Sequence, residues 1–243
     1  MPDRFDHVDE TPRKFRVYLI QGLVWFGVLA LAFAVDRPVA QFLRDSEFPA
    51  RFKGSLLAEV LKIPGDFWFT ATVGVLLWIF HPRGWRAAVL VCLAALVSGI
   101  NSILKWMAGR VRPFKLPGRP DELLPFQFEP FIGGIPGLWS AKNICFPSGH
   151  AALAFATAQM LAMLLPRQRW WFYAGAAVVG IERVAENAHY TSDVVAAAIL
   201  GVYGARFVWW LCDLVFLRLD AEPPGFGVQM PHDLDQPQVS DYK

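Results

Sequence analysis

Cysteine is scarce in this chain, with only Cys92, Cys145 and Cys212 among 243 residues. Their odd number and wide separation argue against a disulfide framework, and they show no metal-ligand spacing. Charge is also sparse, because 18% of the residues are Asp, Glu, Lys or Arg and the formal net charge is +2. No basic cluster indicates a nucleic-acid partner. We therefore expect buried thiols without a catalytic role, and no bound nucleic acid.

Apolar residues, by contrast, are abundant. They make up 55% of the chain, and its mean hydropathy is +0.35, whereas soluble domains average about 45–50% apolar residues. The ten tryptophans and twenty phenylalanines suit the aromatic belts that membrane proteins place at both lipid–water interfaces. The composition therefore predicts contact with membrane lipids.

The apolar residues fall into six runs that we interpret as transmembrane helices: 17–35, 64–80, 87–104, 151–166, 170–181 and 194–212. A helix needs about 20 residues to cross a hydrocarbon layer of about 30 Å. The fifth run reaches that length only if it extends to His189 and carries charged residues near the membrane boundary, where they are candidates for a functional site. The predicted fold class is all-α: a polytopic membrane bundle of six transmembrane helices at 17–217, between a cytoplasmic segment at 1–16 and a disordered tail at 218–243.

The N-terminal segment is positively charged and lacks the pattern of a cleavable signal peptide. Positive residues favour the cytoplasmic side of a membrane, and this segment contains Arg4, Arg13, Lys14 and Arg16. The bias is modest, because the first outer loop is also basic, with Arg37, Arg44, Arg51 and Lys53. With a cytoplasmic N-terminus, the loops after the third and fifth helices share the outer face, which is the periplasmic face of an inner membrane.

Three short motifs lie in those two loops and at the helix ends beside them. They are Lys105-x6-Arg112-Pro113, Pro147-Ser148-Gly149-His150 and Arg183-x5-His189-x3-Asp193. Together they supply three cations, a glycine at a helix start and two histidines, which are the groups needed to hold a phosphate dianion and transfer it to an imidazole. Guanidinium groups bind phosphate oxygens bidentately, whereas lysine contributes a compact charge.

The second motif stands directly before the fourth apolar run. Ser148 is a favoured residue at a helix N-cap, and the free N–H groups and dipole of a helix start attract an anion. Gly149 permits close approach of the backbone, and His150 in the first turn can donate a proton to a leaving oxygen.

In the third motif, His189 and Asp193 are four residues apart. If both are helical they share one face, and the carboxylate can accept the Nδ1–H while the other ring nitrogen attacks. Alternatively, Thr191 or Ser192 caps the sixth helix and Asp193 reaches back from its first turn.

The order and spacing of these motifs resemble the signature of the type 2 phosphatidic acid phosphatase (PAP2) superfamily, over roughly residues 100 to 195. The resemblance implies His189 as the nucleophile that forms a phosphohistidine, Asp193 as its partner and His150 as the general acid. It also implies that no metal or other cofactor is required and that the phosphate is held by Lys105, Arg112, Ser148, Gly149 and Arg183. The family has a serine where this chain has Glu182, a carboxylate that would repel phosphate unless it points away or pairs with an arginine.

The sequence therefore predicts a membrane-embedded, metal-independent phosphatase whose partner is a lipid phosphate or diphosphate. The candidate substrates are phosphatidic acid, phosphatidylglycerol phosphate, undecaprenyl diphosphate and lipid A 1-phosphate. One alternative is a lipid phosphotransferase that uses the same phosphohistidine, and another is a non-catalytic phospholipid-binding protein. A vanadium haloperoxidase is disfavoured because that branch of the family is soluble. The sequence predicts no oligomeric state.

Two further features have open interpretations. Asp66 is interpreted as the cap of the second helix, with a contact to the site as the alternative. The long loop at 114–146, rich in proline and phenylalanine, is interpreted as a partly interfacial lid beside the site, with a plain connector as the alternative.

Overall fold

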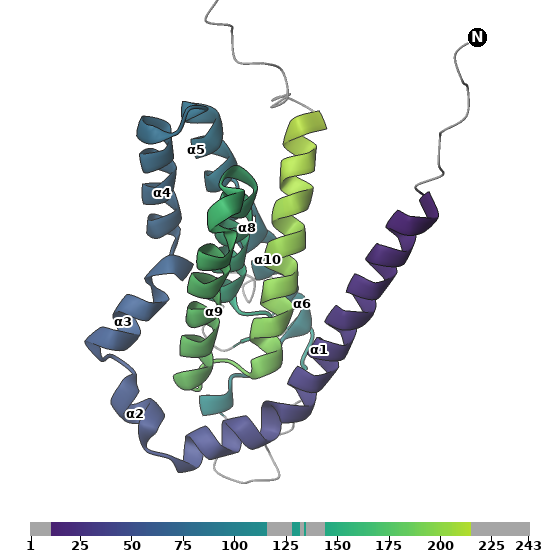
Figure 1. Cartoon of the computed structure of the whole chain (residues 1–243). Coiled ribbons are helices and arrows are strands. Elements are labelled where there is room, and N and C mark those ends of the chain that lie inside the picture. Colours follow the sequence, from purple (N-terminus) through teal and green to yellow (C-terminus); the bar gives the residue numbers. More distant parts are fainter. Residues whose placement is uncertain (1–10, 116–127, 132–133, 135–143, 215–243) are drawn as a thin grey trace, which may run out of the picture.

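The computed structural model describes residues 11–115, 128–131, 134 and 144–214, and over these residues the chain is helical apart from turns and two isolated β-bridges (Figure 1). The predicted all-α fold class is confirmed. The predicted tail at 218–243, most of the segment at 1–16 and most of the lid loop lie outside the described residues.

The α-helices are α1 (Thr11–Asp45), α2 (Phe48–Phe52), α3 (Leu56–Lys62), α4 (Phe67–Phe80), α5 (Gly84–Cys92), α6 (Ala94–Ala108), α8 (Gly149–Leu164), α9 (Arg169–Ala185) and α10 (Thr191–Cys212). Short 3₁₀ turns are η1 (Ile63–Gly65), η2 (Pro113–Lys115) and η5 (Pro166–Gln168).

Three helical stretches of the described chain are long and apolar enough to cross a membrane, namely 16–45, 84–108 and 191–212. A fourth is obtained if α3, η1 and α4, which are bent by 59°, form one broken span. The remaining two predicted spans are shorter than the roughly 20 residues that a crossing needs, because α8 has 16 residues and α9 has 17. At 1.5 Å per residue α8 is about 24 Å long, so length and composition do not establish the full count of six.

Helix α8 is the centre of the bundle, with α9 and α10 packed along it (Figure 1). Eleven of its 16 residues are buried, and six of those are alanines. Small side chains let helices approach closely in lipid, where the hydrophobic effect does not drive their association. The approach to α10 is closest at Gly201, where a Cβ would lie 2.7 Å from the carbonyl oxygen of Ala152. At this contact the backbone of α10 at Gly201 therefore touches both backbone and side-chain atoms of α8.

Two polar contacts connect α8 to its neighbours inside the bundle. The hydroxyl of Thr157 lies 2.9 Å from that of Thr70 on α4, and Tyr173 on α9 donates to Oε1 of Gln159 at 2.6 Å. Hydrogen bonds of this kind between membrane helices contribute about 0.6 to 2 kcal/mol each.

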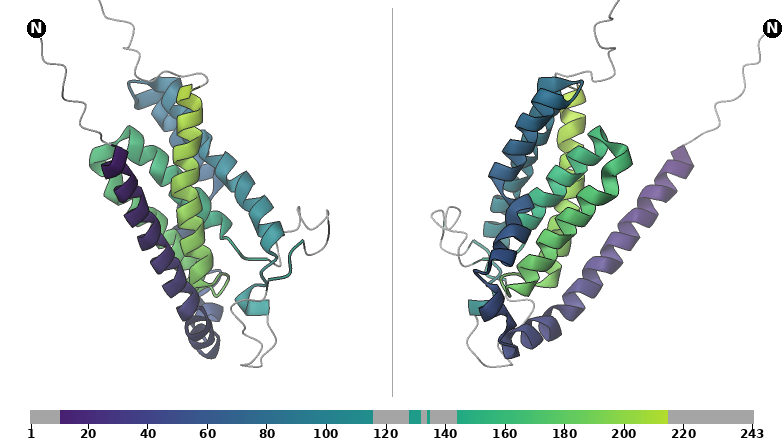
Figure 2. Two further views of the ribbon diagram at one scale, coloured as in Figure 1. Left: turned by 90° about the vertical axis from the view of Figure 1, so that its right-hand side faces the viewer. Right: turned by 60° about the vertical axis from the view of Figure 1, so that its left-hand side comes forward.

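Helix α1 leans away from the bundle over its first half and meets it near its C-terminal end (Figure 2). Its buried residues are Ala32, Asp36 and Ala40, which are four residues apart and therefore lie on one face. The buried carboxylate on that apolar face, Asp36, is paired with Arg110.

Two short helices were not predicted, since the whole stretch between the first two apolar runs, 36–63, was interpreted as a loop, whereas α1 continues to Asp45. Helices α2 and α3 lie there, at the lower end of the molecule in Figure 1, and Leu56, Leu57 and Val60 of α3 are at least half exposed. The expectation of buried thiols holds for Cys145 only. Cys92 is exposed at the end of α5, on the outer surface of a bundle whose exterior is largely apolar.

Candidate active site

The three motifs meet at one end of the bundle. Helices α6 and α9 end there and α8 and α10 begin there, at the bottom of Figure 1. The N-terminal end of α1 is at the opposite end. Each motif sits at a helix terminus, where the side chains and the unpaired backbone groups of several elements can face the same space.

Lys105, in the last turn of α6, is buried, with 7% of its surface exposed. Its Nζ lies beside the first residue of α8, since a Cβ added to Gly149 would be only 3.8 Å away. This places an ammonium group next to the free N–H groups of a helix start, and both attract an anion.

Arg112 lies beyond the end of α6, where its guanidinium stands 6.0 Å from the centre of the Phe114 ring and donates to the carbonyl of Ala188 at 3.4 Å. Burial lowers the pKa of the Arg112 guanidinium, and the nearby cation of Arg183 lowers it as well. Since arginine stays protonated in proteins, two positive charges from separate motifs face each other across the site.

Arg183 is held between two carboxylates. It donates from Nε and Nη2 to Glu182, and Nη2 also lies 3.0 Å from Oε2 of Glu186. Glu182 is buried, so its charge requires a partner. The carboxylate that replaces the serine of the PAP2 pattern therefore pairs with the adjacent arginine, which is one of the two possibilities foreseen from the sequence.

Ser148 occupies the N-cap position of α8 but makes no side-chain cap bond. Its backbone N–H donates to the carbonyl of Asp193 at 3.1 Å, which joins the start of α8 to the start of α10. Its buried Oγ has no hydrogen-bond partner among the described residues. A buried hydroxyl in that condition has a free hydrogen-bonding capacity that a phosphate oxygen can fill.

His150 contacts Asp66, so the preferred interpretation of Asp66 as a helix cap is wrong and the alternative, a contact to the site, is the one observed. Its Nε2 lies 3.1 Å from Oδ1 of Asp66, which stands at the N-cap position of α4 but forms no side-chain cap bond there. Asp66 turns to the site because η1 packs against α8, and Gly65 is so close to His150 that a Cβ would lie 2.9 Å from the histidine Cβ.

His189 lies in the connection between α9 and α10, with 3% of its surface exposed. The extension of the fifth helix to His189 is wrong, because α9 ends at Ala185 and Asn187 adopts a left-handed conformation with φ of 54°. Asp193 is in the first turn of α10 and reaches back: Oδ2 accepts from the Tyr190 N–H at 2.9 Å and lies 3.4 Å from Nδ1 of His189. This is the second arrangement considered above, although Tyr190 stands at the N-cap.

The environment keeps His189 neutral. Burial lowers its pKa to about 4, the neighbouring Asp193 opposes that shift, and the cations Lys105 and Arg112 add to it. A neutral imidazole with a carboxylate on the Nδ1 side has a free lone pair on Nε2. Separated from Asp193 by 3.4 Å, Nδ1 makes a loose contact of the kind that tightens when a substrate binds.

The PAP2 superfamily model matches residues 83–215, more than half of the chain, and the match includes all three motifs. The chain belongs to the PAP2 superfamily. This PAP2 protein is therefore a phosphatase, and its apolar helices make it an integral membrane protein.

Two curated relatives that this PAP2 phosphatase matches over most of its length are lipid A phosphatases. The chain is 29% identical over 219 residues to a lipid A 1-phosphatase of Rhizobium etli, which covers 81% of this chain and 88% of the relative. It is also 29% identical to a lipid A 4'-phosphatase of Bacteroides thetaiotaomicron, over 76% of this chain and 80% of the relative. Among solved structures, a transmembrane PAP2-type phosphatidylglycerolphosphate phosphatase from Bacillus subtilis has the same fold, with a TM-score of 0.52, 19% identity and coverage of 79% and 96% of the two chains.

Sequence reasoning missed two residues that contact the third motif. Arg110 lies within the first motif, between Lys105 and Arg112, and donates to Asp193 Oδ1 at 2.6 Å and to Asp36 Oδ2 at 2.8 Å. Asp36 is 156 residues away in sequence from Ser192, which it contacts within the third motif, so no local pattern connects them. The only signal available was a lone carboxylate directly after the first apolar run.

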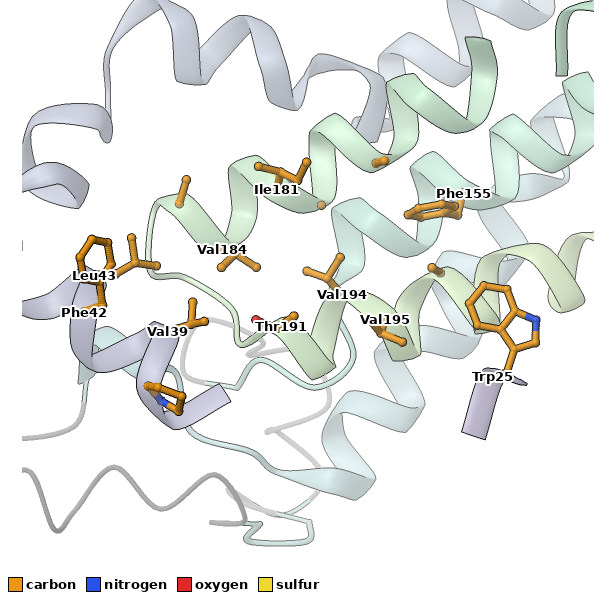
Figure 3. Close-up of a pocket in the computed structure, with 15 residues that line it drawn as sticks. Trp25, Val39, Phe42, Leu43, Phe155, Ile181, Val184, Thr191, Val194 and Val195 are labelled. Atoms are coloured by element: carbon orange, nitrogen blue, oxygen red, sulfur yellow. The ribbon is translucent and has the colours of Figure 1, made fainter. Parts of the chain in front are cut away.

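A lateral, apolar groove of about 760 Å³ opens between α1 on one side and α9 and α10 on the other (Figure 3). Phe42 and Leu43 of α1 and Val184 of α9 line the end nearer to the site, while Trp25 stands at the other end. Leu43 also borders a second, more polar cavity of about 530 Å³.

The second cavity adjoins the phosphate-binding candidates. Glu186, the partner of Arg183, lines it, and so does Phe114, whose ring lies beneath Arg112. Arg44 and Lys53 also line it and supply positive charge. The apolar groove and the polar cavity therefore share a border at Leu43 and lead toward the motifs.

Within the described residues no group of three or more His, Cys, Asp or Glu side chains is arranged to hold a metal ion. Metal-independent turnover stays a prediction.

Proposed function

We propose that this PAP2 phosphatase removes a phosphate group from a membrane lipid through a phosphohistidine formed on His189. The observation that carries the proposal is the side-by-side placement of a neutral, buried His189 and the Asp193 carboxylate, at the same bundle end as Lys105, Arg112 and His150. A binding protein would need the cations but not the histidine and carboxylate pair.

In the first step Nε2 of His189 attacks phosphorus. The N–P bond forms while the bond between phosphorus and the lipid oxygen breaks, and His150 donates a proton to that oxygen. In the second step His150 takes a proton from water, which attacks the phosphohistidine, so that inorganic phosphate leaves and His189 is restored. Asp193 holds the Nδ1–H side of the ring throughout.

The charge that develops on the phosphoryl oxygens is stabilised by positioned donors, which supply most of the catalysis in phosphoryl transfer. These donors are Lys105, the backbone N–H groups at Gly149 beside it, the Ser148 hydroxyl and Arg112. Arg183 joins them when the incoming phosphate competes with Glu182 and Glu186 for its donors.

We assign the substrate to the phosphorylated lipids, with lipid A 1-phosphate as the first candidate, because the relatives that match over most of their length are lipid A phosphatases. The groove between α1 and α9 and α10 supports a lipid, since its apolar lining suits an acyl chain whose polar end extends past Leu43 toward the cations.

We further assign the site to the outer face of the inner membrane, with a cytoplasmic N-terminus. The basic residues of the N-terminal segment, Arg4, Arg13, Lys14 and Arg16, support this orientation, and the N-terminal end of α1 lies at the end of the bundle opposite to the site. Thiol labelling of single cysteines placed at 54 and 83 in cells would test it, because only the first position should react with an impermeant reagent.

The decisive experiment is phosphate release by the purified, detergent-solubilised protein from phosphatidic acid, phosphatidylglycerol phosphate, undecaprenyl diphosphate and lipid A 1-phosphate. His189→Ala should lower release by at least about 1,000-fold, because it removes the nucleophile. The matched control is His81→Ala, a histidine at the far end of α4, which should retain full activity.

Activity of His189→Ala near that of the wild type would overturn the assignment of the nucleophile. Absence of release from all four lipids, together with accumulation of a phosphorylated lipid acceptor, would convert the proposal to a phosphotransferase.

A further inference from the structure

The carboxylate that faces His189 is fixed by a buried network that includes helix α1. Asp193 Oδ1 accepts from Arg110 Nη1 at 2.6 Å, and Asp36 Oδ2 accepts from Arg110 Nη2 at 2.8 Å. One guanidinium therefore bridges two carboxylates from α1 and α10. All three side chains are at most 1% exposed.

Ser192 closes the network. Its N–H donates to Asp36 Oδ1 at 2.8 Å, its hydroxyl contacts Asp36 Oδ2, and the same hydroxyl accepts from Arg110 Nη1 at 2.7 Å. Both oxygens of Asp36 are thus occupied by residues at the start of α10. The network ties the first turn of α10, which carries Asp193, to α1 and to the segment after α6.

The backbone and the surrounding rings hold the guanidinium in place. Gly109 ends α6 in a left-handed conformation with φ of 64°, which turns the chain so that Arg110 enters the interior. The guanidinium carbon then lies 3.9 Å from the centre of the Tyr190 ring and 5.5 Å from those of Phe33 and Phe128. Aromatic faces attract a cation and exclude water from its hydrogen bonds.

We propose that Arg110, anchored by Asp36, is a positioning residue that fixes the Asp193 carboxylate so that it directs the Nδ1–H of His189 and leaves Nε2 free to attack. The inference deepens the proposed function and rests on it for its kinetic consequences. Arg110 donates to Oδ1 of Asp193, whereas the Tyr190 N–H donates to Oδ2. With both oxygens held, the carboxylate has one orientation toward His189.

Lysine cannot replace arginine here, although it keeps the charge. Its single ammonium lacks the planar fork that reaches Asp36, Ser192 and Asp193 at once. In metal sites, loss of a group that orients a ligand without touching the metal lowers affinity or activity by about 10- to 100-fold, and we expect an effect of the same size from a group that orients a catalytic carboxylate.

The test compares purified Arg110→Lys and Asp36→Asn with wild type, using Arg86→Lys as the matched control on an exposed residue of α5. The amount of folded protein is first measured by size-exclusion chromatography, so that a loss of stability is distinguished from a lower kcat. We expect kcat per folded molecule to fall by about 10- to 100-fold in Arg110→Lys and by less in Asp36→Asn, whose amide oxygen still accepts. KM should change by less than about threefold, because the phosphate-binding groups are untouched.

A second readout does not depend on turnover. The ¹⁵N spectrum of the His189 ring, assigned by its absence in His189→Ala, should show mainly the Nδ1–H tautomer in the wild type and a shift toward Nε2–H in Arg110→Lys. An unchanged tautomer and a kcat within about twofold of wild type would overturn the proposal and leave Arg110 with a structural role alone. If the wild type releases no phosphate from any lipid, the proposed function fails, and the spectrum still decides whether Arg110 positions the ring.

Discussion

Oδ1 of Asp66 lies 3.1 Å from Nε2 of His150, so the residue before α4 reaches the first turn of α8. The two side chains have about 40% of their surface exposed, unlike the buried His189 and Asp193. The site therefore contains two histidine–carboxylate pairs in different surroundings, one open and one enclosed. This difference suits a proton donor that exchanges with water and a nucleophile that is shielded from it.

Replacing Asp66 should affect protonation of the leaving group more than attack on phosphorus. Asp66→Asn removes the carboxylate that holds the His150 ring but leaves the histidine in place, and we expect kcat for a lipid substrate to fall by about 10- to 100-fold, up to the lower end of the range of general acid–base effects. Hydrolysis of p-nitrophenyl phosphate, whose leaving group needs no proton, should fall by less than about threefold. An equal loss on both substrates would contradict a role in proton donation.

The pH dependence of activity should reflect the lowered pKa of His189. Since its pKa is about 4, below the ordinary value of about 6.5, the proposed nucleophile stays neutral throughout the physiological range. We expect no loss of kcat/KM between pH 7 and pH 5.5 that is due to His189. The groups facing the ring are Asp193, Lys105 and Arg112, and none of these carries an ordinary pKa in that interval.

The same shift has a consequence for stability. Between pH 6.5 and about 4 the unfolded chain binds a proton at His189 that the folded chain does not, so stability falls as the pH falls through that window. Thermal unfolding in detergent should show a smaller difference between pH 7 and pH 5 for His189→Gln than for the wild type. Identical pH dependence in the two proteins would show that His189 is not the responsible group.

Glu182 should weaken phosphate binding by occupying Arg183. In Glu182→Ser the guanidinium keeps Glu186 as a partner and gains donors for phosphate, so KM and the inhibition constant for vanadate should both fall, by about threefold or more. Glu59→Ser, which removes the exposed partner of Lys62 on α3, is the matched control and should change neither. A higher KM in Glu182→Ser would mean that Glu182 contributes to substrate binding instead of opposing it.

Narrowing the groove should discriminate between substrates by the length of their chains. Val195→Phe adds bulk inside the groove, and Val178→Phe adds the same bulk to the exposed face of α9 outside it. We expect only the first to raise KM for a long-chain lipid phosphate, by about tenfold, because it displaces about two methylenes of about 0.8 kcal/mol each. The KM for a water-soluble phosphate monoester should stay unchanged in both, and an effect of Val178→Phe equal to that of Val195→Phe would count against the groove.

Turnover should persist in EDTA, and vanadate should inhibit it. Vanadate adopts the five-coordinate geometry of the transferring phosphoryl group and should therefore bind more tightly than phosphate. Residual activity below about a tenth after EDTA treatment, restored by a divalent cation, would replace the phosphohistidine mechanism with a metal-assisted one.

The sequence supported the fold and the motifs for physical reasons. Apolar runs locate membrane helices because lipid requires every backbone group to be bonded within the segment, and the run at 194–212 lies within α10. The ends of helices were less predictable. The fifth helix was predicted to extend to His189 because a membrane span needs about 20 residues. The chain instead leaves α9 at Ala185, and Asn187 adopts a left-handed conformation.

Contacts between distant segments were beyond the sequence. Asp66 was interpreted as a cap because Asp is common at that position, but the close packing of η1 on α8 brings it to His150. Arg110 and Asp36 were missed because 74 residues separate them and neither belongs to a periodic pattern. Only the fold shows that the two charges meet.

The close approach at Gly201 has a consequence at the active site. His150 opens α8, and His189 directly precedes Tyr190 at the start of α10. Those two helices touch where Gly201 faces the backbone of Ala152, three residues into α8. A side chain at position 201 would therefore push apart the two helices whose first turns adjoin His150 and His189.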